Sequence, residues 1–147
     1  MSLDLRPSML DDLGLKPALD WYFERYTQQT GIGVDFDPQE LDQKRFSSEI
    51  EITIFRIVQE SLTNVARHAE VEKVYVQLVA FQDTLELMIE DEGIGFALEE
   101  QKAGSSSGLT GMTERTRLLQ GEMEIQSVPG KGTRIMVRLP LRQEESS

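Results

Sequence analysis

The sequence predicts an α+β two-layer sandwich, in which one mixed sheet carries helices on one face. Three observations lead to this prediction. Helical and strand-like hydrophobic patterns follow one another in the order helix, strand, helix, hairpin, helix, hairpin. The length of 147 residues suits one domain with a sizeable core. The composition, with 39% hydrophobic and 28% charged residues, is typical of a globular protein. Patterns in this order favour helices packed against a sheet.

The first elements are predicted from prolines, glycines and hydrophobic spacing. Residues 1–17 contain two prolines and a glycine and are predicted to be an irregular linker from an upstream segment. A helix is predicted from Ala18, and Gly31 marks its end. Alternating hydrophobic residues over 32–36 predict a short strand that Pro38 closes.

The remaining elements follow from the same two hydrophobic periods. Ser47, which is followed by acidic residues, predicts the capped start of a helix that continues for about 20 residues. The alternation over residues 72–90 predicts a β-hairpin. A further helix is expected at 109–120, and two strands are expected at 123–127 and 133–139.

Composition excludes several classes of function. The formal net charge of −11 argues against a protein that binds the phosphate backbone of nucleic acids. The absence of cysteine excludes disulfides, zinc–thiolate sites and thiol nucleophiles. No hydrophobic run is long enough to span a bilayer, and the first residues show no basic stretch followed by an apolar one, so no secretion signal is visible. We therefore expect a cytoplasmic domain.

The long central helix carries polar residues that share one side at helical spacing: Glu60, Asn64, Arg67 and His68. Mg²⁺ takes few protein ligands when phosphates and water complete its shell, so one amide oxygen is sufficient. The cationic side chains would then meet anionic oxygens. The alternative is an ordinary solvated helix face.

Two glycines follow an acidic residue at the predicted end of a strand. Gly93 and Gly95 permit a close backbone approach, and Asp91 can accept a hydrogen bond from an exocyclic amine such as that of adenine. The alternative is a turn with an Asp cap. The segment lacks the third glycine of a dinucleotide fingerprint, and the chain has no Walker A motif.

Two more segments are rich in glycine. Residues 104–112 lead directly into a helix, whose first N–H groups suit a phosphate. Residues 130–133 form a tight turn that brings a hydroxyl to the start of a strand. Each of these two segments alone is compatible with a surface loop or a hairpin turn. Together with the helix stripe and the segment that begins at Asp91, their order and spacing form a specific sequence signal.

In that order the segments resemble the ATP-binding domain of sensor histidine kinases, within the superfamily of DNA gyrase, MutL and heat-shock chaperone ATPases. The matching segments are 59–69 for the N box, 91–96 for the G1 box, 108–115 for the G2 box and 127–133 for the closing turn. The amino-acid sequences of these segments most resemble those of the nitrate-sensor and lipid-fluidity-sensor branch of two-component kinases. The resemblance covers about residues 13–141 and implies a Bergerat sandwich, a five-stranded mixed sheet backed by three helices.

The resemblance implies a phosphate side of the site. Asn64 would ligate Mg²⁺ that bridges the ATP phosphates, and Glu60 would lie near the γ-phosphate as a polarising or basic group. Arg67 and His68 would approach phosphate oxygens.

The resemblance also implies an adenine side and a lid. Asp91 would bind the adenine amine, with Thr133 near the same pocket, and Gly93 and Gly95 would let the loop approach the nucleotide. A lid at about 97–107, expected to be poorly ordered without nucleotide, would cover ATP. Its phosphate-side hinge would consist of Gly108, Leu109, Gly111 and Met112. Many relatives have a glycine where this chain has Ser106, so we expect the lid to differ from theirs in flexibility.

The implied function is transfer of the γ-phosphate of ATP to a histidine on a separate dimerisation domain, with a response regulator downstream. His68 is the only histidine and lies in the N box, so it is a poor candidate for the acceptor. Residues 1–17 would then lead from a missing dimerisation domain into the ATP-binding domain at 18–142, with 143–147 as a tail. We expect this piece to be monomeric and its parent to be a homodimer, either free or membrane-anchored. The alternatives are a serine kinase of the anti-sigma-factor type and a non-catalytic interaction module.

Overall fold

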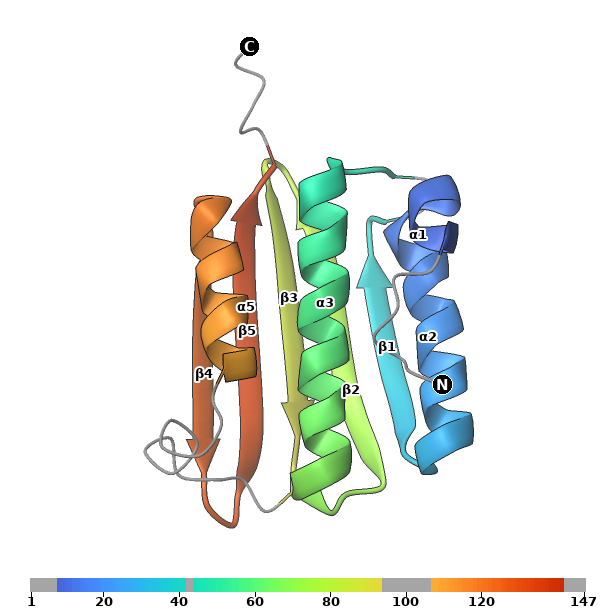
Figure 1. The fold of residues 1–147 in the computed structure, drawn as a ribbon, viewed down its shortest axis with the longest axis vertical. Helices are drawn as coiled ribbons and strands as arrows, with labels where there is room; N and C mark the ends of the chain where they lie inside the picture. Colours follow the sequence, from blue (N-terminus) through green and yellow to red (C-terminus); the bar gives the residue numbers. More distant parts are fainter. Residues whose placement is uncertain (1–7, 42–43, 94–106, 142–147) are drawn as a thin grey trace.

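The structure is a computed structural model that describes residues 8–41, 44–93 and 107–141, with the backbone alone described at 68–69 and 107–110. In chain order the elements are α1 (Ser8–Leu13), α2 (Leu15–Thr30), β1 (Gly33–Gln39), α3 (Ser48–Asn64), the π-helical segment η1 (Val65–Ala69), β2 (Lys73–Phe81), β3 (Thr84–Asp91), α5 (Ser107–Leu118), β4 (Glu122–Val128) and β5 (Gly132–Pro140) (Figure 1).

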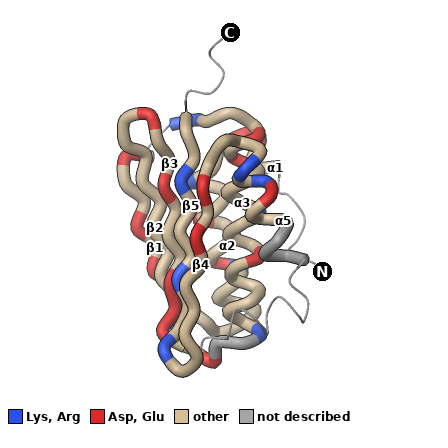
Figure 2. Tube along the Cα trace, turned by 90° about the vertical axis from the view of Figure 1, so that its left-hand side faces the viewer, with Lys and Arg blue, Asp and Glu red and all other residues tan. Residues whose placement is uncertain are grey.

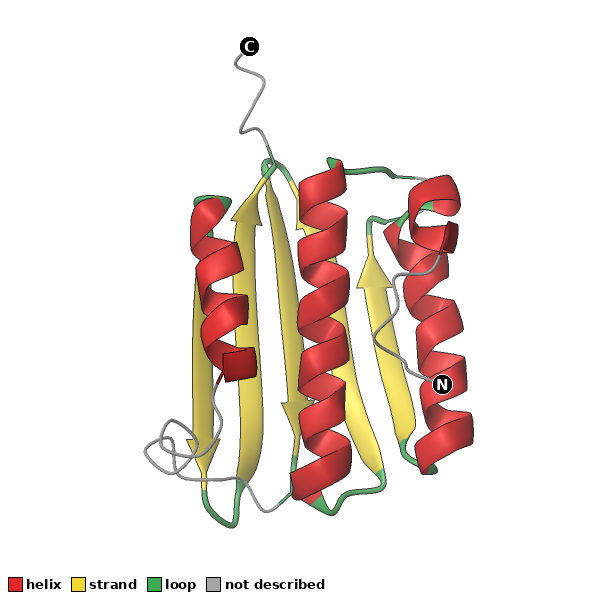
Figure 3. Cartoon of the chain, in the orientation of Figure 1, coloured by secondary structure: helices red, strands yellow, loops and turns green. Residues whose placement is uncertain are grey.

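The strands form one five-stranded sheet in the order β1-β2-β3-β5-β4. β1 pairs parallel with β2, and every other neighbouring pair is antiparallel. The helices lie in a second layer on one face of this sheet, as the side view in Figure 2 and the view onto the helices in Figure 3 show. These findings confirm the predicted α+β sandwich with a mixed sheet. Within the described residues, no helix is long and apolar enough to cross a membrane.

The core lies between the two layers. Buried and more exposed residues alternate along β2 and β3, so every second side chain faces the helices. α3 presents a broad buried face to the sheet, which includes Ile50, Ile54, Phe55, Ile57, Val58 and Leu62. Its start agrees with the prediction, because the hydroxyl of Ser47 accepts a hydrogen bond of 3.2 Å from the backbone N–H of Ile50.

The prediction of irregular structure at the N-terminus is wrong for the part that the structure describes. α1 and the start of α2 occupy that part, and Gly14 joins them with a φ of +102°. Leu10 and Leu15 are each 1% exposed, so burial of both side chains holds the two helices on the core. Pro17 does not interrupt α2, because it lies in the first turn, where a backbone N–H has no partner inside the helix.

The packed domain therefore begins by residue 8 rather than at residue 18. The origin of residues 1–17 in a missing dimerisation domain stays a prediction. The predicted tail at 143–147 lies outside the described residues.

Candidate functional site

The segments singled out in the sequence meet at one end of the sheet. α3 and β3 both end there, β5 begins there, and α5 has its first turn on that side (lower part of Figure 1). α3 contacts both β3 and α5. The antiparallel register of β3 and β5 places Asp91 opposite Thr133, so two predicted adenine-side residues are neighbours.

Asp91 is the last residue of β3 and is buried, with 5% of its surface exposed. One of its carboxylate oxygens, Oδ1, accepts a hydrogen bond of 2.8 Å from the backbone N–H of Gly93. Burial raises the pKa of Asp91 above its ordinary value of 3.8, and the nearby charge of Glu90 adds to this effect. Hydrogen bonds from the backbone of Gly93 and Thr133 act in the opposite direction. The carboxyl group is thus fixed in position while it is partly removed from water.

The start of β5 approaches Asp91 so closely that only glycine fits there. Gly132 has a φ of +103°, and a Cβ at this position would collide with the backbone of Asp91 and Glu92. The next residue, Thr133, shares a side-chain hydrogen bond of 2.9 Å with Ser127 of β4. Gly132 was not singled out from the sequence for this purpose, although it belongs to the closing turn.

The phosphate-side residues come from the end of α3 and from η1. Glu60 and Asn64 lie one turn apart in α3, and both are partly exposed. The sequence analysis assumed that α-helical spacing continues through Arg67 and His68. This assumption is wrong, because α3 ends at Asn64 and the backbone continues as a π-helix. A π-helix has more residues per turn, so the backbone after Asn64 does not follow the expected spacing of 3.6 residues.

Arg67 is exposed within η1, and the side chain of His68 lies outside the described residues. Of the four predicted residues, Glu60 and Asn64 are the two that the structure places on one face of α3.

The predicted hinge residues belong to α5, where they differ in environment. Met112 is 4% exposed and packs in the core, and its carbonyl accepts a hydrogen bond of 2.8 Å from the hydroxyl of Thr116. Gly111 is exposed, and a Cβ there would meet nothing within 4 Å. Only the backbone is described at Gly108 and Leu109. Residues 97–106 of the lid predicted at about 97–107 lie outside the described residues, as does Gly95, and residue 107 begins α5.

A hollow of about 520 Å³ lies at the end of the sheet beside Asp91. Its lining includes Lys131 of the β4–β5 turn, Gly132 and Thr133 at the start of β5, and Glu92 after β3. Glu90, Gln126 and Arg134 also line it, and they alternate with the helix-facing residues of their strands, so this hollow opens mainly on the face of the sheet opposite the helices. Asn64 does not line this hollow.

The amide oxygen of Asn64 suits a magnesium ion that a bound nucleotide would hold for the most part. Among the described residues, no group of three or more His, Asp or Glu side chains could hold a metal ion. An ion at Asn64 would therefore take most of its oxygen ligands from phosphates and water, as Mg²⁺ commonly does.

Sequence analysis missed Tyr26 as a residue of this region and treated it only as part of a hydrophobic helix face. Its hydroxyl donates a hydrogen bond of 2.7 Å to the carbonyl oxygen of Leu62, in the last turn of α3. Burial and the negative charge of Asp91 raise the pKa of Tyr26, so this hydroxyl stays protonated. No local sequence signal predicts this contact, which joins residues 36 positions apart.

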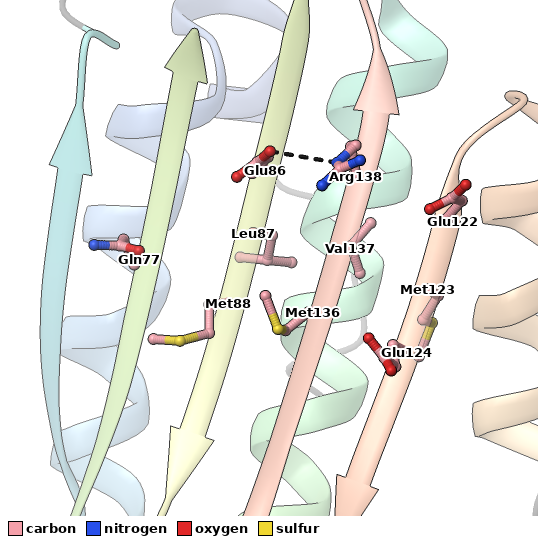
Figure 4. Close-up of a pocket in the computed structure, with 10 residues that line it drawn as sticks. All are labelled: Gln77, Glu86, Leu87, Met88, Glu122, Met123, Glu124, Met136, Val137 and Arg138. Atoms are coloured by element: carbon pink, nitrogen blue, oxygen red, sulfur yellow. Dashed lines mark ion pairs between the residues drawn. The ribbon is translucent and has the colours of Figure 1, made fainter.

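A separate hollow of about 440 Å³ lies on the face of the sheet opposite the helices (Figure 4). Met88 of β3 and Met136 of β5 are register partners near its centre. Glu86 and Arg138 form an ion pair of 3.3 Å at its border. None of the predicted site residues lines this hollow, so it is distinct from the site at the end of the sheet.

Comparison with known sequences assigns the chain to a family. The profile described as "Histidine kinase-, DNA gyrase B-, and HSP90-like ATPase" matches residues 49–143. This chain belongs to that family, as an ATP-binding domain of the sensor histidine kinase type.

Particular relatives support the assignment. The chain is 41% identical over 142 residues to the signal transduction histidine-protein kinase/phosphatase DegS of Brevibacillus brevis, covering 97% of this chain and 36% of the relative. It is 36% identical over 141 residues to the oxygen sensor histidine kinase NreB of Staphylococcus carnosus, covering 96% of this chain and 40% of the relative. The chain therefore spans well under half the length of these relatives.

Solved structures show the same fold. The histidine kinase domain of the blue-light-activated histidine kinase from Erythrobacter litoralis has a TM-score of 0.70 at 23% identity, over 90% of this chain and 67% of that one. The histidine kinase AdeS of Acinetobacter baumannii has a TM-score of 0.64 at 15% identity, over 92% of this chain and 74% of that one.

Proposed function

We propose that this domain binds Mg²⁺–ATP and presents the γ-phosphate to a histidine on a separate dimerisation domain, as the catalytic part of a sensor histidine kinase. The observation that carries the proposal is the buried, backbone-anchored carboxyl group of Asp91 beside the end of α3, in a chain whose relatives are sensor histidine kinases. A fixed acceptor at this position suits recognition of one base rather than general binding of phosphate.

On the adenine side, Asp91 accepts a hydrogen bond from the exocyclic amine of adenine. The backbone contact from Gly93 holds the carboxylate in one orientation, so its free lone pairs have a fixed direction. Thr133 lies opposite on β5 and borders the same hollow. In this proposal Gly95 lets the following loop approach the nucleotide.

On the phosphate side, the carbonyl oxygen of Asn64 would hold Mg²⁺, and the ion would supply positive charge against the triphosphate. Arg67 and His68 approach the phosphate oxygens, and Glu60 polarises the transfer near the γ-phosphate. α5 adds the free N–H groups of its first turn, where negative charge is favoured. The proposed hinge of the lid lies in that turn and the next and consists of Gly108, Leu109, Gly111 and Met112.

The transfer step moves the terminal phosphoryl group from ATP to nitrogen. A ring nitrogen of the acceptor histidine attacks the γ-phosphorus, the bond to the bridging β–γ oxygen breaks, and ADP leaves with the bonding electron pair. The phosphate-side residues position the reactants and neutralise the negative charge of the phosphates. A response regulator would then receive the phosphoryl group on an aspartate, and we place this work in the cytoplasm, where ATP is available.

The direct test mixes this chain with a separately made, histidine-bearing dimerisation domain from a relative and with ATP labelled at the γ-phosphate. We expect acid-labile, base-stable label on the added domain and no stable label on this chain. Label on a serine of an antagonist protein would instead favour a serine kinase. No binding of ATP at millimolar concentration with Mg²⁺ would favour a non-catalytic interaction module. Sedimentation of the chain alone tests the expectation that it is monomeric.

A further inference from the structure

The hydroxyl of Tyr26 connects α2 to the end of α3. Tyr26 is 1% exposed, and its ring packs against Tyr22, with 6.1 Å between ring centroids. From this buried position the hydroxyl reaches the carbonyl oxygen of Leu62 at 2.7 Å. A hydrogen bond of this length is well formed, and its two groups belong to elements far apart in the sequence.

This contact lies where the backbone changes its helical form. The N–H of Val65 donates to the carbonyl oxygens of both Leu62 and Ser61, and the π-helical segment begins at Val65. The Leu62 carbonyl therefore accepts two hydrogen bonds, one from Val65 and one from Tyr26, which uses both of its lone pairs. Short π-helical segments are costly and persist where surrounding contacts stabilise them.

The change of helical form affects the positions of the proposed phosphate-side residues. Asn64 is the last residue of α3, two positions after Leu62, and Arg67 lies within η1. Asn64 follows Leu62 by two residues and Arg67 follows it by five, so both come after the Leu62 carbonyl along the same backbone. A shift of this carbonyl therefore changes the positions of both side chains together.

We propose that Tyr26 is a positioning residue for the phosphate side of the nucleotide site: its hydroxyl, bonded to the Leu62 carbonyl, holds the turn that places Asn64 and Arg67. The inference rests on the proposed function, because it assigns a role toward the same nucleotide. Tyr26 acts through the backbone of α3 and does not itself touch the ligand.

The hydroxyl is protonated and able to donate, as a tyrosine normally is at physiological pH. Burial, and after it the negative charge of Asp91, raise the pKa of Tyr26 further. An action of Tyr26 on the adenine side, through Asp91, is the rival outcome of the test.

The test is Tyr26→Phe in this chain, which removes one oxygen and keeps the ring. We expect the dissociation constant for Mg²⁺–ATP to rise about threefold to tenfold, as for the loss of one buried hydrogen bond. Binding of adenosine, which has no phosphates, should change by less than about twofold. Amide hydrogen exchange at residues 62–69 should become faster.

The matched control is Tyr22→Phe, which removes the same atom one turn earlier in α2. Tyr22 is 0% exposed and packs edge-on against Phe55, at 5.7 Å in the middle of α3 and away from Leu62. We expect unchanged affinity for Mg²⁺–ATP and unchanged exchange at residues 62–69.

Three results overturn the inference. One is an unchanged affinity of Tyr26→Phe for Mg²⁺–ATP. Another is an equal loss for adenosine and Mg²⁺–ATP, which would indicate general loosening or an effect through Asp91. The third is the same loss in Tyr22→Phe. Failure of the unsubstituted chain to bind Mg²⁺–ATP would instead contradict the proposed function, so the two failures are distinguishable.

Discussion

Asp91 combines two properties at the scale of a single residue: its carboxyl group is buried, and two backbone groups hold it in place. Both follow from its position at the end of β3, opposite the start of β5. A buried acceptor with a fixed direction discriminates between partners, because the wrong base leaves it without a hydrogen bond.

Asp91→Ala should lower the preference for adenine over guanine nucleotides by about tenfold or more, since it removes one charged hydrogen-bond acceptor. Competition of ATP and GTP against a fluorescent ADP analogue measures this preference. Glu90→Ala is the control, because Glu90 is the neighbouring acid and pairs with Arg134 at 3.0 Å. Unchanged selectivity in Asp91→Ala would remove the adenine assignment.

The raised pKa of Asp91 also predicts how stability depends on pH. Below the ordinary value of 3.8, the carboxyl group is protonated in both the folded and the unfolded chain and contributes no difference. As the pH rises from 3.8 through the raised folded value, the unfolded chain loses its proton more readily, so folding becomes less favourable. Ionised Asp91 thus costs stability at neutral pH.

Asp91→Asn should therefore be more stable than the unsubstituted chain at pH about 7, and this advantage should shrink toward pH about 3.5. Urea unfolding at several pH values measures the difference in the free energy of unfolding. An advantage for Asp91→Asn that stays constant across this range would show that the pKa of Asp91 is not raised in the folded state.

Gly132→Ala should destabilise the fold by about 2–4 kcal/mol, because the new methyl group meets the backbone of Asp91 and the backbone is strained at a φ of +103°. Gly130→Ala provides the control. Gly130 also has a positive φ, of +84°, but a Cβ there meets nothing within 4 Å, so we expect only about 1 kcal/mol. Equal losses in chemical denaturation would refute the packing argument.

At the scale of elements, the end of α3 decides how the phosphate-side residues are presented. The hydrophobic face of α3 is well predicted by a period of 3.6 residues, from Ile50 to Leu62. The same period fails after Asn64, where the π-helical segment begins. A change of this kind depends on contacts from outside the helix, such as the hydroxyl of Tyr26.

Asn64→Ala should weaken Mg²⁺-dependent binding of ATP by about tenfold while the fold stays intact, because the side chain is partly exposed. Calorimetric titrations with and without Mg²⁺ measure the effect. Thr63→Ala, at the neighbouring and equally half-exposed position, is the control. If the unsubstituted chain and Asn64→Ala each bound ATP equally well with and without Mg²⁺, the assignment of Asn64 as a metal ligand would be wrong.

At the scale of the whole molecule, an ion pair between the exposed Arg45 and the buried Glu51 joins the first helix to the central one. The carboxylate of Glu51, 3% exposed in α3, accepts hydrogen bonds of 3.0 and 3.1 Å from the guanidinium of Arg45. The same guanidinium donates to the carbonyl oxygen of Asp11 at 3.1 Å. Arg45 therefore anchors the C-terminal end of α1 to the start of α3.

Arg45→Ala should lower the midpoint of thermal unfolding, since it leaves the carboxylate of Glu51 buried without its cationic partner. Amide exchange at residues 8–14 should also become faster. Lys44→Ala, at the adjacent exposed position, should change neither measurement. Unaltered exchange at 8–14 in Arg45→Ala would show that α1 is held by its leucines alone.

Local sequence patterns were sufficient to predict the fold class, the order of the elements from α2 onward, the cap at Ser47 and the family to which the nucleotide motifs belong. These depend on local periods and on short motifs, which each segment carries whatever its neighbours. The folded structure was needed to show that α1 is a helix and that α2 begins at Leu15, that a π-helical segment follows Asn64, and that Gly132 and Tyr26 support Asp91 and α3. Each of these features depends on a contact between residues distant in the chain, and only folding brings those residues together.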